Sequence, residues 1–343
     1  MQAMFEETVG RVLGYYVTPE SLAAAERGEW PADLWDAITE NGLAIAAAPE
    51  ERGGVGGSWH DAFVLVRAAG RFVAPLPLAE TILVNWLMGL AGADVAPGAA
   101  TLAIGDGTLD GDRFTGTLDG VAWGRQAGHV LTAVGDGRTL VLLACADASV
   151  VPAFNTAREP RDTLVFTGAR AAVVATLPAA MPTETLLLGG AMIRSAQIAG
   201  GLSHLLDTAI DYANQRVQFG RPIGKFQAIQ HQLAVLAEQT ALASAAAELA
   251  FASSERAPCV SGIAAAKTIA SDAAGQGAAI AHAVLGAIGF TYEHSLHFTT
   301  RRLWSWRSEF GSQAFWAQRL GREMCAQGAG GYWPKLTSAM TPA

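Results

Sequence analysis

Residues 216–231 form the most informative stretch of the chain, RVQFGRPIGKFQAIQH. Apolar residues at helical spacing precede and follow it, so the stretch connects two helices. Gly220 permits a turn, and Pro222 prevents the first helix from continuing. Arg216 can pair with a phosphate or a carboxylate, and the next helix offers its N-terminus to an anion. A capped loop between two helices has the same features, so physical chemistry alone leaves both interpretations open.

The sequence around this stretch predicts a bundle of long helices. One helix opens at Pro182, a second begins near Lys225, and a third covers residues 263–285. Gly200-Gly201 and many alanines allow the helix axes to approach closely, which favours compact packing.

The chain upstream divides into two further zones. Residues 1–93 contain capped helical patterns, such as Phe63, Val66 and Ala69 on one face. Residues 94–181 consist of short Val- and Thr-rich runs separated by Gly-Asp turns, which is typical of a small antiparallel sandwich or barrel. We therefore predict a mainly α chain with a central β domain: an N-terminal helical domain (1–93), a β domain (94–181) and a C-terminal four-helix bundle (182–343).

Composition limits the possible functions. The 343 residues are 51% hydrophobic and 16% charged, with a formal net charge of −8. No long basic run is present, so a nucleic-acid partner is not expected. The three cysteines share no metal or disulfide spacing, and the N-terminus lacks a signal-peptide pattern, so we expect a cytoplasmic protein without a metal site. The uncharged stretch 273–292 is rich in Ala and Gly, which favours a buried helix over a membrane span.

Residues 216–231, preceded by Tyr212 and Ala213, resemble the flavin-contacting signature of the acyl-CoA dehydrogenases. Two glycine-rich segments, residues 49–57 and 286–294, also resemble loops of that family, and the order of helical, β and helical zones agrees with it. The resemblance covers nearly the whole chain. It implies an acyl-CoA dehydrogenase-like fold and FAD-dependent α,β-dehydrogenation of an acyl-CoA thioester to a 2-enoyl-CoA.

The resemblance also implies site residues and partners. In such proteins, a group of residues in this signature contacts the FAD of a neighbouring subunit. The matching residues here are Arg216, Gln218, Phe219, Phe226 and Gln227. The turn from Gly286 to Gly289 is expected against the cofactor diphosphate, where a bare backbone can approach. The expected electron acceptor is an electron-transfer flavoprotein or a similar protein.

The sequence departs from the family pattern in its β domain. The family's flavin and substrate loops are absent from residues 102–113 and 121–131, and Ala283 replaces a glutamine that usually contacts the cofactor. Related short chains pair with a more complete chain, notably for sterol-derived acyl-CoAs. We therefore expect a hetero-oligomer in which the partner holds most of the flavin.

The catalytic base is the second departure. Phe310 occupies the position where the family most often places its glutamate, and Glu309 lies one residue earlier, rotated by about 100° if the segment is helical. The alternative is that Glu309 has a structural role, as a carboxylate that pairs with an arginine such as Arg307. Some family members carry the base on an earlier helix, near Glu255 here. Three interpretations stay open: a subunit without the base, a self-sufficient homo-oligomer that uses Glu309, and a structural or CoA-binding subunit without a flavin role.

Overall fold

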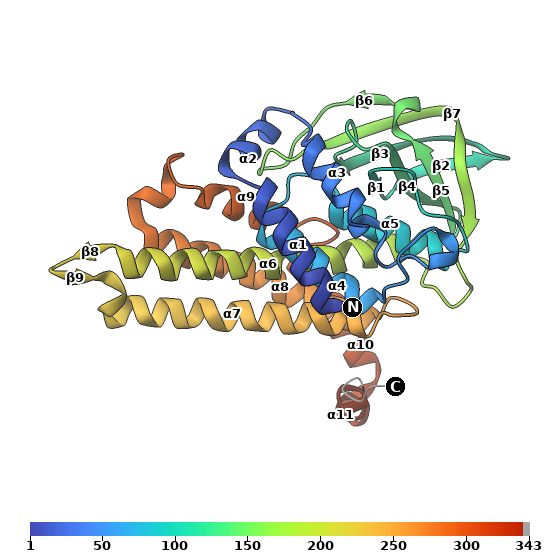
Figure 1. Cartoon of the computed structure of the whole chain (residues 1–343). Helices are drawn as coiled ribbons and strands as arrows, with labels where there is room; N and C mark the ends of the chain where they lie inside the picture. The colour runs from blue at the N-terminus through green and yellow to red at the C-terminus, as the bar shows by residue number, and fades with distance from the viewer. Residues whose placement is uncertain (339–343) are drawn as a thin grey trace.

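The computed structural model describes residues 1–338, and its N-terminal part is helical (Figure 1). Side-chain caps fix two of the helix starts, because Thr18 and Ser58 each form a capping box with the residue three positions later. The helices of this part are α1 (Gln2–Tyr16), α2 (Pro19–Glu26), α3 (Ala32–Glu40), α4 (Trp59–Arg71) and α5 (Leu78–Leu90).

The central part is one curled seven-stranded sheet. The strands run in the order β1-β4-β5-β7-β3-β2, and β6 pairs with β7. All neighbouring pairs are antiparallel except β1 with β4. The strands are β1 (Ala100–Leu102), β2 (Gly105–Asp110), β3 (Arg113–Ala122), β4 (His129–Val134), β5 (Thr139–Ala144), β6 (Ser149–Val151) and β7 (Arg161–Thr176).

The long strand β7 explains why a single sheet forms. Its 16 residues pair with β3 at one end and with β5 at the other, and β-bulges interrupt both ladders. Bulges increase the local twist, so one strand can belong to both halves of a curled sheet. The apolar residues inside the curl form a core of their own, which includes Phe114, Leu164 and Phe166.

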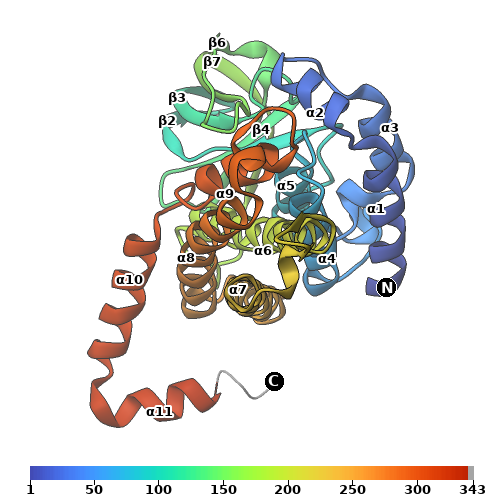
Figure 2. The ribbon, with the colours of Figure 1, turned by 90° about the vertical axis from the view of Figure 1, so that its left-hand side faces the viewer.

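The C-terminal part returns to helices and packs beneath the sheet (Figure 2). Helix α6 crosses the centre of the molecule and contacts α4, α7, α8 and α9. Helix α10 packs against α8, and Figures 1 and 2 show α11 at the end that leads away from the body. The helices are α6 (Thr185–Gln215), α7 (Gln227–Ala252), α8 (Val260–Leu285), α9 (Leu296–Trp306), α10 (Gln313–Ala326) and α11 (Gly328–Ser338).

The predicted close approach at Gly200 is confirmed, and its partner is α4. A Cβ atom added to Gly200 would lie 1.9 Å from the carbonyl oxygen of Arg67. The glycine therefore lets the N-terminal helices pack directly on the central helix of the bundle.

Helix α8 contains most of the uncharged stretch 273–292. By length and composition, α7 and the segment Val260–Phe290 are both apolar enough to cross a membrane, a test that core helices also pass. The helix α8 packs against α6, α7 and α10, and its buried residues include Ile263, Ala270 and Ala274.

Candidate functional site

The segment that follows α6 is a β-hairpin. The helix ends at Gln215, seven residues before Pro222, so the sequence-based assignment of Pro222 as the helix terminator is wrong. Arg216 caps the helix in an extended conformation, and Val217 and Gln218 then pair with Pro222 and Arg221. These two-residue strands are β8 (Val217–Gln218) and β9 (Arg221–Pro222).

The turn of this hairpin places an aromatic residue in a strained conformation. Phe219 and Gly220 both have positive φ, +53° and +78°, as in the two-residue hairpin turns that favour Asn-Gly. A left-handed φ costs a residue with a Cβ atom about 1–2 kcal/mol. Phe219 is 90% exposed, so burial within this chain does not offset that cost. Strain combined with exposure is typical of a residue kept for binding.

A groove of about 690 Å³ lies at the base of the hairpin and brings three predicted residues together. Arg216 and Gln218 form one side, and Gly286 forms part of the other. Gly286 has φ +64° and ψ −140°, a conformation that only glycine adopts readily, and the space before it is open. The rest of the lining is largely apolar and includes Ile223 and Val284, so the groove combines a guanidinium group, an amide and a bare backbone, which suit a phosphate, with an apolar wall.

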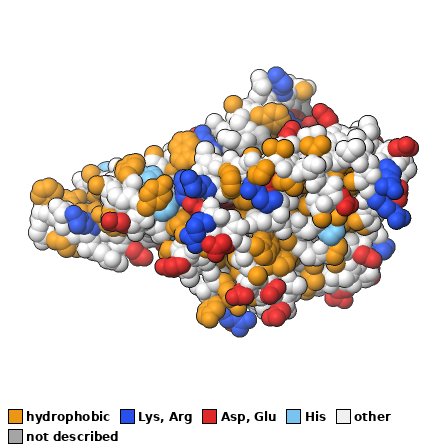
Figure 3. Space-filling model, turned by 90° about the horizontal axis from the view of Figure 1, so that it is seen from above, with side chains coloured by type: hydrophobic (Ala, Val, Ile, Leu, Met, Phe, Trp, Pro, Cys, Tyr) orange, Lys and Arg blue, Asp and Glu red, His pale blue; other side chains and the backbone are white. Residues whose placement is uncertain are grey.

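The other predicted cofactor residues lie outside the groove lining. Phe226 packs edge-on to Phe219 with ring centroids 6.0 Å apart, and the Arg221 guanidinium lies 4.2 Å above its ring. Gln227 is exposed at the first position of α7, and Gly289 is buried behind the glycine turn. Figure 3 shows this narrow end of the molecule, where hydrophobic, basic and histidine side chains lie close together at the surface.

Glu309 lies in a buried network of ion pairs that joins separate elements. Its carboxylate accepts hydrogen bonds from Arg161 Nε at 2.9 Å, from Arg194 Nε at 2.7 Å and from Asn155 Nδ2 at 3.2 Å. Arg194 also pairs with Glu80 at 2.6 Å. The network therefore connects α5, β7, α6 and the loop after α9.

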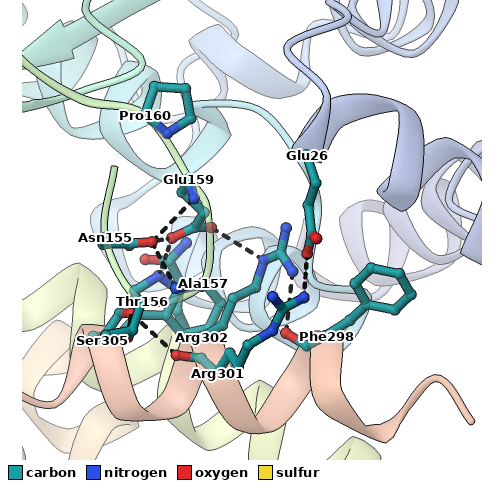
Figure 4. A network of polar contacts seen from close by, with 12 residues as sticks. Glu26, Asn155, Thr156, Ala157, Glu159, Pro160, Phe298, Arg301, Arg302 and Ser305 are labelled. Atoms are coloured by element: carbon teal, nitrogen blue, oxygen red, sulfur yellow. Dashed lines mark hydrogen bonds and ion pairs between the residues drawn. The ribbon is translucent and has the colours of Figure 1, made fainter. Parts of the chain in front are cut away.

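The network continues through Glu159, which Figure 4 shows between Asn155 and Arg302. Glu159 accepts hydrogen bonds from Arg302 Nε at 3.1 Å and from the indole N–H of Trp306 at 3.1 Å. Arg161 also reaches it at 3.0 Å. Both side chains of the Glu159–Arg302 pair are at most 4% exposed, so α9 is fixed to the sheet by a dry ion pair.

The environment of Glu309 makes it a weak base. Burial alone would raise the pKa of its carboxyl group, but the guanidinium groups of Arg161 and Arg194 and their hydrogen bonds outweigh burial and lower the pKa to about 2. A general base works best when its pKa is near the working pH. The predicted pairing with Arg307 is wrong, because Arg161 and Arg194 hold Glu309 and the Arg307 guanidinium lies 4.6 Å above the Trp304 ring.

The second candidate base, Glu255, has a structural role. Its two carboxylate oxygens accept hydrogen bonds from the backbone N–H groups of Trp59 at 2.9 Å and His60 at 3.1 Å. A carboxylate at a helix N-terminus stabilises the exposed N–H groups there. Glu255 therefore anchors the start of α4 to the loop between α7 and α8.

The sequence analysis did not find Arg161, Arg194 or Glu80. Their pairs with Glu309 and with each other join residues more than 100 positions apart, such as Arg194 with Glu309, which local patterns do not reveal. One signal is present: Arg194 is the single Lys, Arg, Asp or Glu residue between Glu184 and Asp207, in a mostly apolar helix. Among residues 1–338, no group of three or more His, Cys, Asp or Glu side chains is placed to hold a metal ion.

Comparison with known families agrees with the fold. The acyl-CoA dehydrogenase N-terminal domain matches residues 1–94, and the acyl-CoA dehydrogenase C-terminal domain matches residues 182–324. The chain belongs to the acyl-CoA dehydrogenase family, whose members are oxidoreductases and flavoproteins.

Two relatives come from Mycobacterium tuberculosis. The acyl-CoA dehydrogenase IpdE2 is 31% identical over 87% of this chain and 89% of its own length. The acyl-CoA dehydrogenase FadE34 is 33% identical over 85% of this chain, which spans only 42% of FadE34. A solved structure titled "Tcur3481-Tcur3483 steroid ACAD G363A variant" aligns with a TM-score of 0.85, at 26% identity, over 96% of this chain and 98% of that chain.

The network gives a pH-dependent contribution to stability. Because the folded pKa of Glu309 is lowered from its ordinary 4.5 to about 2, the stabilisation is present above pH 4.5 and is lost as the pH falls towards 2. The difference in free energy of unfolding between wild type and Glu309→Gln should therefore shrink by about 3 kcal/mol across that window. Urea unfolding at a series of pH values measures it.

A surface carboxylate provides the control for this experiment. Glu6 pairs with Arg67 and its side chain is 60% exposed, so Glu6→Gln should cost less than about 1 kcal/mol at every pH. If Glu309→Gln lowers the free energy of unfolding by the same amount at neutral and at acidic pH, the lowered pKa of Glu309 is contradicted.

Proposed function

We propose that this chain is one subunit of a hetero-oligomeric acyl-CoA dehydrogenase, and that its hairpin contacts an FAD held mainly by a partner subunit. The observation that carries the proposal is the state of Glu309: the carboxylate nearest the family's base position is neutralised by Arg161 and Arg194. Phe310, which takes that position, has no proton-accepting group. The base that removes the α-proton then belongs to the partner.

The residues at the groove suit a dinucleotide cofactor. FAD, when bound, takes up the hydride from the β-carbon of the acyl-CoA. Arg216 would neutralise a negatively charged diphosphate, and Gln218 would hydrogen-bond a polar group of the cofactor. Phe219 supplies an exposed aromatic face that needs a flat partner, and Gly286 lets that partner approach the backbone.

An apolar stripe on α7 supports the oligomeric state. Val235, Leu242 and Leu249 are each seven residues apart, so they lie on one face of the helix, and they are 40%, 47% and 52% exposed. Exposed apolar side chains that are aligned in this way are typical of a protein interface. Glu238 and Glu248 on the same helix, together with the net charge of −8, favour a protein partner over an anionic lipid surface.

We propose a bulky, sterol-derived acyl group as the substrate class. The support is the likeness to the structure whose title names a steroid ACAD and two components. An electron-transfer flavoprotein is the proposed acceptor, as in the sequence-based expectation.

The first experiment measures flavin content. The chain purified alone should carry little flavin absorbance, and the chain co-expressed with the product of the neighbouring gene should carry it. Losing the Arg216 contact should cost about 1.5–3 kcal/mol of cofactor binding, so Arg216→Ala complexes should release FAD about 10- to 150-fold more readily. Arg170→Ala is the matched control, because Arg170 pairs with Asp112 on the exposed sheet, away from the hairpin.

Two outcomes separate the alternatives. A stoichiometric yellow protein from this chain alone would indicate a self-sufficient homo-oligomer. A complex that retains FAD equally with Arg216→Ala and with Arg170→Ala would leave this chain without a flavin role.

A second prediction uses the strain at the hairpin turn. Asn tolerates a left-handed φ better than Phe, so Phe219→Asn should raise the free energy of unfolding of the isolated chain by up to about 1 kcal/mol. The same change should weaken FAD retention in the complex, because the aromatic face is lost. Thermal unfolding and flavin release, measured on the same preparations, test the two effects. Unchanged flavin retention in Phe219→Asn would show that Phe219 does not contact the cofactor.

A third prediction separates catalysis from structure. Glu309→Gln and Glu80→Gln both remove a carboxylate from Arg194, so both should affect stability, and turnover of the complex should stay within a few-fold of wild type for each. Loss of a true base usually costs about 10²–10⁴ in rate. A thousand-fold loss in Glu309→Gln alone, with flavin content unchanged, would make this chain the catalytic subunit.

A further inference from the structure

A small pocket lies where the ends of α1 and α4 meet α2, α6 and α9. Its volume is about 220 Å³. Arg301 on α9 pairs with Glu26 on α2, so two of the helices that border the pocket are fixed to each other (Figure 4). The pocket shares no lining residue with the groove at the hairpin, and none of its lining residues belongs to the ion-pair network around Glu309. It is therefore a separate feature of the molecule.

The end of α4 places a valine where a helix usually has a glycine. Val73 N donates to the carbonyl oxygen of Gly70, Ala74 N donates to that of Ala69, and Val73 has φ +49°. These are the two hydrogen bonds of a Schellman helix end, in which glycine is preferred at the left-handed position. A residue with a Cβ atom adopts that conformation at a cost of about 1–2 kcal/mol. Val73 is 4% exposed and lines the pocket, so the strained backbone holds a branched apolar side chain in the pocket wall.

The pocket also contains a buried hydroxyl group without a partner. Thr299 is 1% exposed, and within residues 1–338 its Oγ1 atom has no hydrogen-bond partner. Its methyl group is turned towards α6, 3.6 Å from the position of a Cβ atom added to Gly201. The hydroxyl group is therefore the branch left to face the pocket that Thr299 lines. An unpaired buried hydroxyl group costs about 1–3 kcal/mol, so a group that binds in the pocket and pairs with it gains that free energy.

The charges around the pocket favour an anion. Arg71 lines the pocket, and among its described lining residues there is no Asp or Glu. Arg71 pairs with Asp207 through Nη2 at 2.8 Å, which uses only part of a guanidinium group with five N–H donors. Ser295 is the N-cap of α9 but makes no side-chain cap, so the helix N-terminus, which attracts negative charge, lies beside a free hydroxyl group. Burial and the charge of Arg71 lower the pKa of His204, so its imidazole is neutral at pH 7 and offers an N–H donor.

We propose that this pocket binds a small carboxylate with an apolar body of about six carbons, since an apolar cavity of about 150 Å³ can hold a benzene molecule. The carboxylate would accept hydrogen bonds from Arg71 and from the hydroxyl groups of Thr299 and Ser295. The apolar body would pack on Phe72 and Val73 in the wall. The proposal goes beyond the proposed function, because neither the flavin nor a partner subunit takes part in it.

The test measures binding to the full chain by calorimetry, with hexanoate as the probe and with 1-hexanol and sulfate as reference ligands. Wild type should bind hexanoate at one saturable site per chain, and each reference ligand more weakly. Thr299→Val keeps the shape of the side chain and removes the hydroxyl group, so it should weaken hexanoate binding about 10- to 150-fold, as should Arg71→Gln. Arg67→Gln is the matched control, because Arg67 lies one turn earlier on α4, pairs with Glu6 and does not line this pocket.

Three results would overturn the proposal. They are the absence of a saturable hexanoate site in wild type, unchanged affinity in Thr299→Val, and binding of 1-hexanol as tight as that of hexanoate. Equal losses in Arg67→Gln and Arg71→Gln would move the anion away from this pocket and would overturn it as well. Thermal unfolding confirms that each variant is folded. Thr299→Val removes an unpaired buried hydroxyl group, so it should fold even if Arg71→Gln does not.

Discussion

The ion pair between Arg194 and Glu309 is the interaction on which the arrangement of the molecule depends. Arg194 comes from the central helix, and through Glu80, Glu309 and Arg161 its network reaches the N-terminal helices, the loop after α9 and the sheet. With Glu159 and Arg302 the network holds three carboxylates and three guanidinium groups, so its formal charge is zero. Removing one partner from such a network leaves a charge buried and unpaired, which typically costs about 3–5 kcal/mol. The three parts of the chain are therefore held in one fixed relation.

The same network decides what chemistry the chain can perform. A carboxylate held by two guanidinium groups is a good anchor and a weak base, because the positive charges stabilise its ionised form. As an anchor Glu309 must stay ionised, whereas as a catalytic base it would have to take up a proton. The two arginines favour the ionised form, and therefore the structural role. The hairpin differs in this respect: Phe219 is strained and 90% exposed, so almost none of its surface is buried in the isolated chain to compensate for the strain.

The sequence predicted the features that depend on local patterns. Helical spacing identified α4 through Phe63, Val66 and Ala69, and the fold class and family are confirmed. Sequence patterns did not show that Arg216 begins a hairpin, because strands of two residues have no periodicity to detect. They also did not identify the partners of Glu309, because Arg161 and Arg194 lie more than 100 residues away and the fold alone brings them together. The predicted cofactor residues stay predictions, although Arg216, Gln218 and Gly286 face one groove.

Residues 309 and 310 act together, and their order along the chain explains why. Successive side chains in a loop point in different directions, so the backbone that turns Glu309 inward to Arg194 turns Phe310 onto Gly190. Exchanging the two residues would place a carboxylate against the bare backbone of α6, and it would leave Glu80 as the remaining carboxylate on Arg194 and Glu159 as the remaining carboxylate on Arg161, which weakens the network. A base is therefore not restored to this chain by a single substitution at residue 310, since the network already satisfies Arg194 and a second carboxylate beside Glu309 would repel it. In the proposed hetero-oligomer, the ion pairs that hold Glu309 therefore go together with a base that the partner subunit supplies.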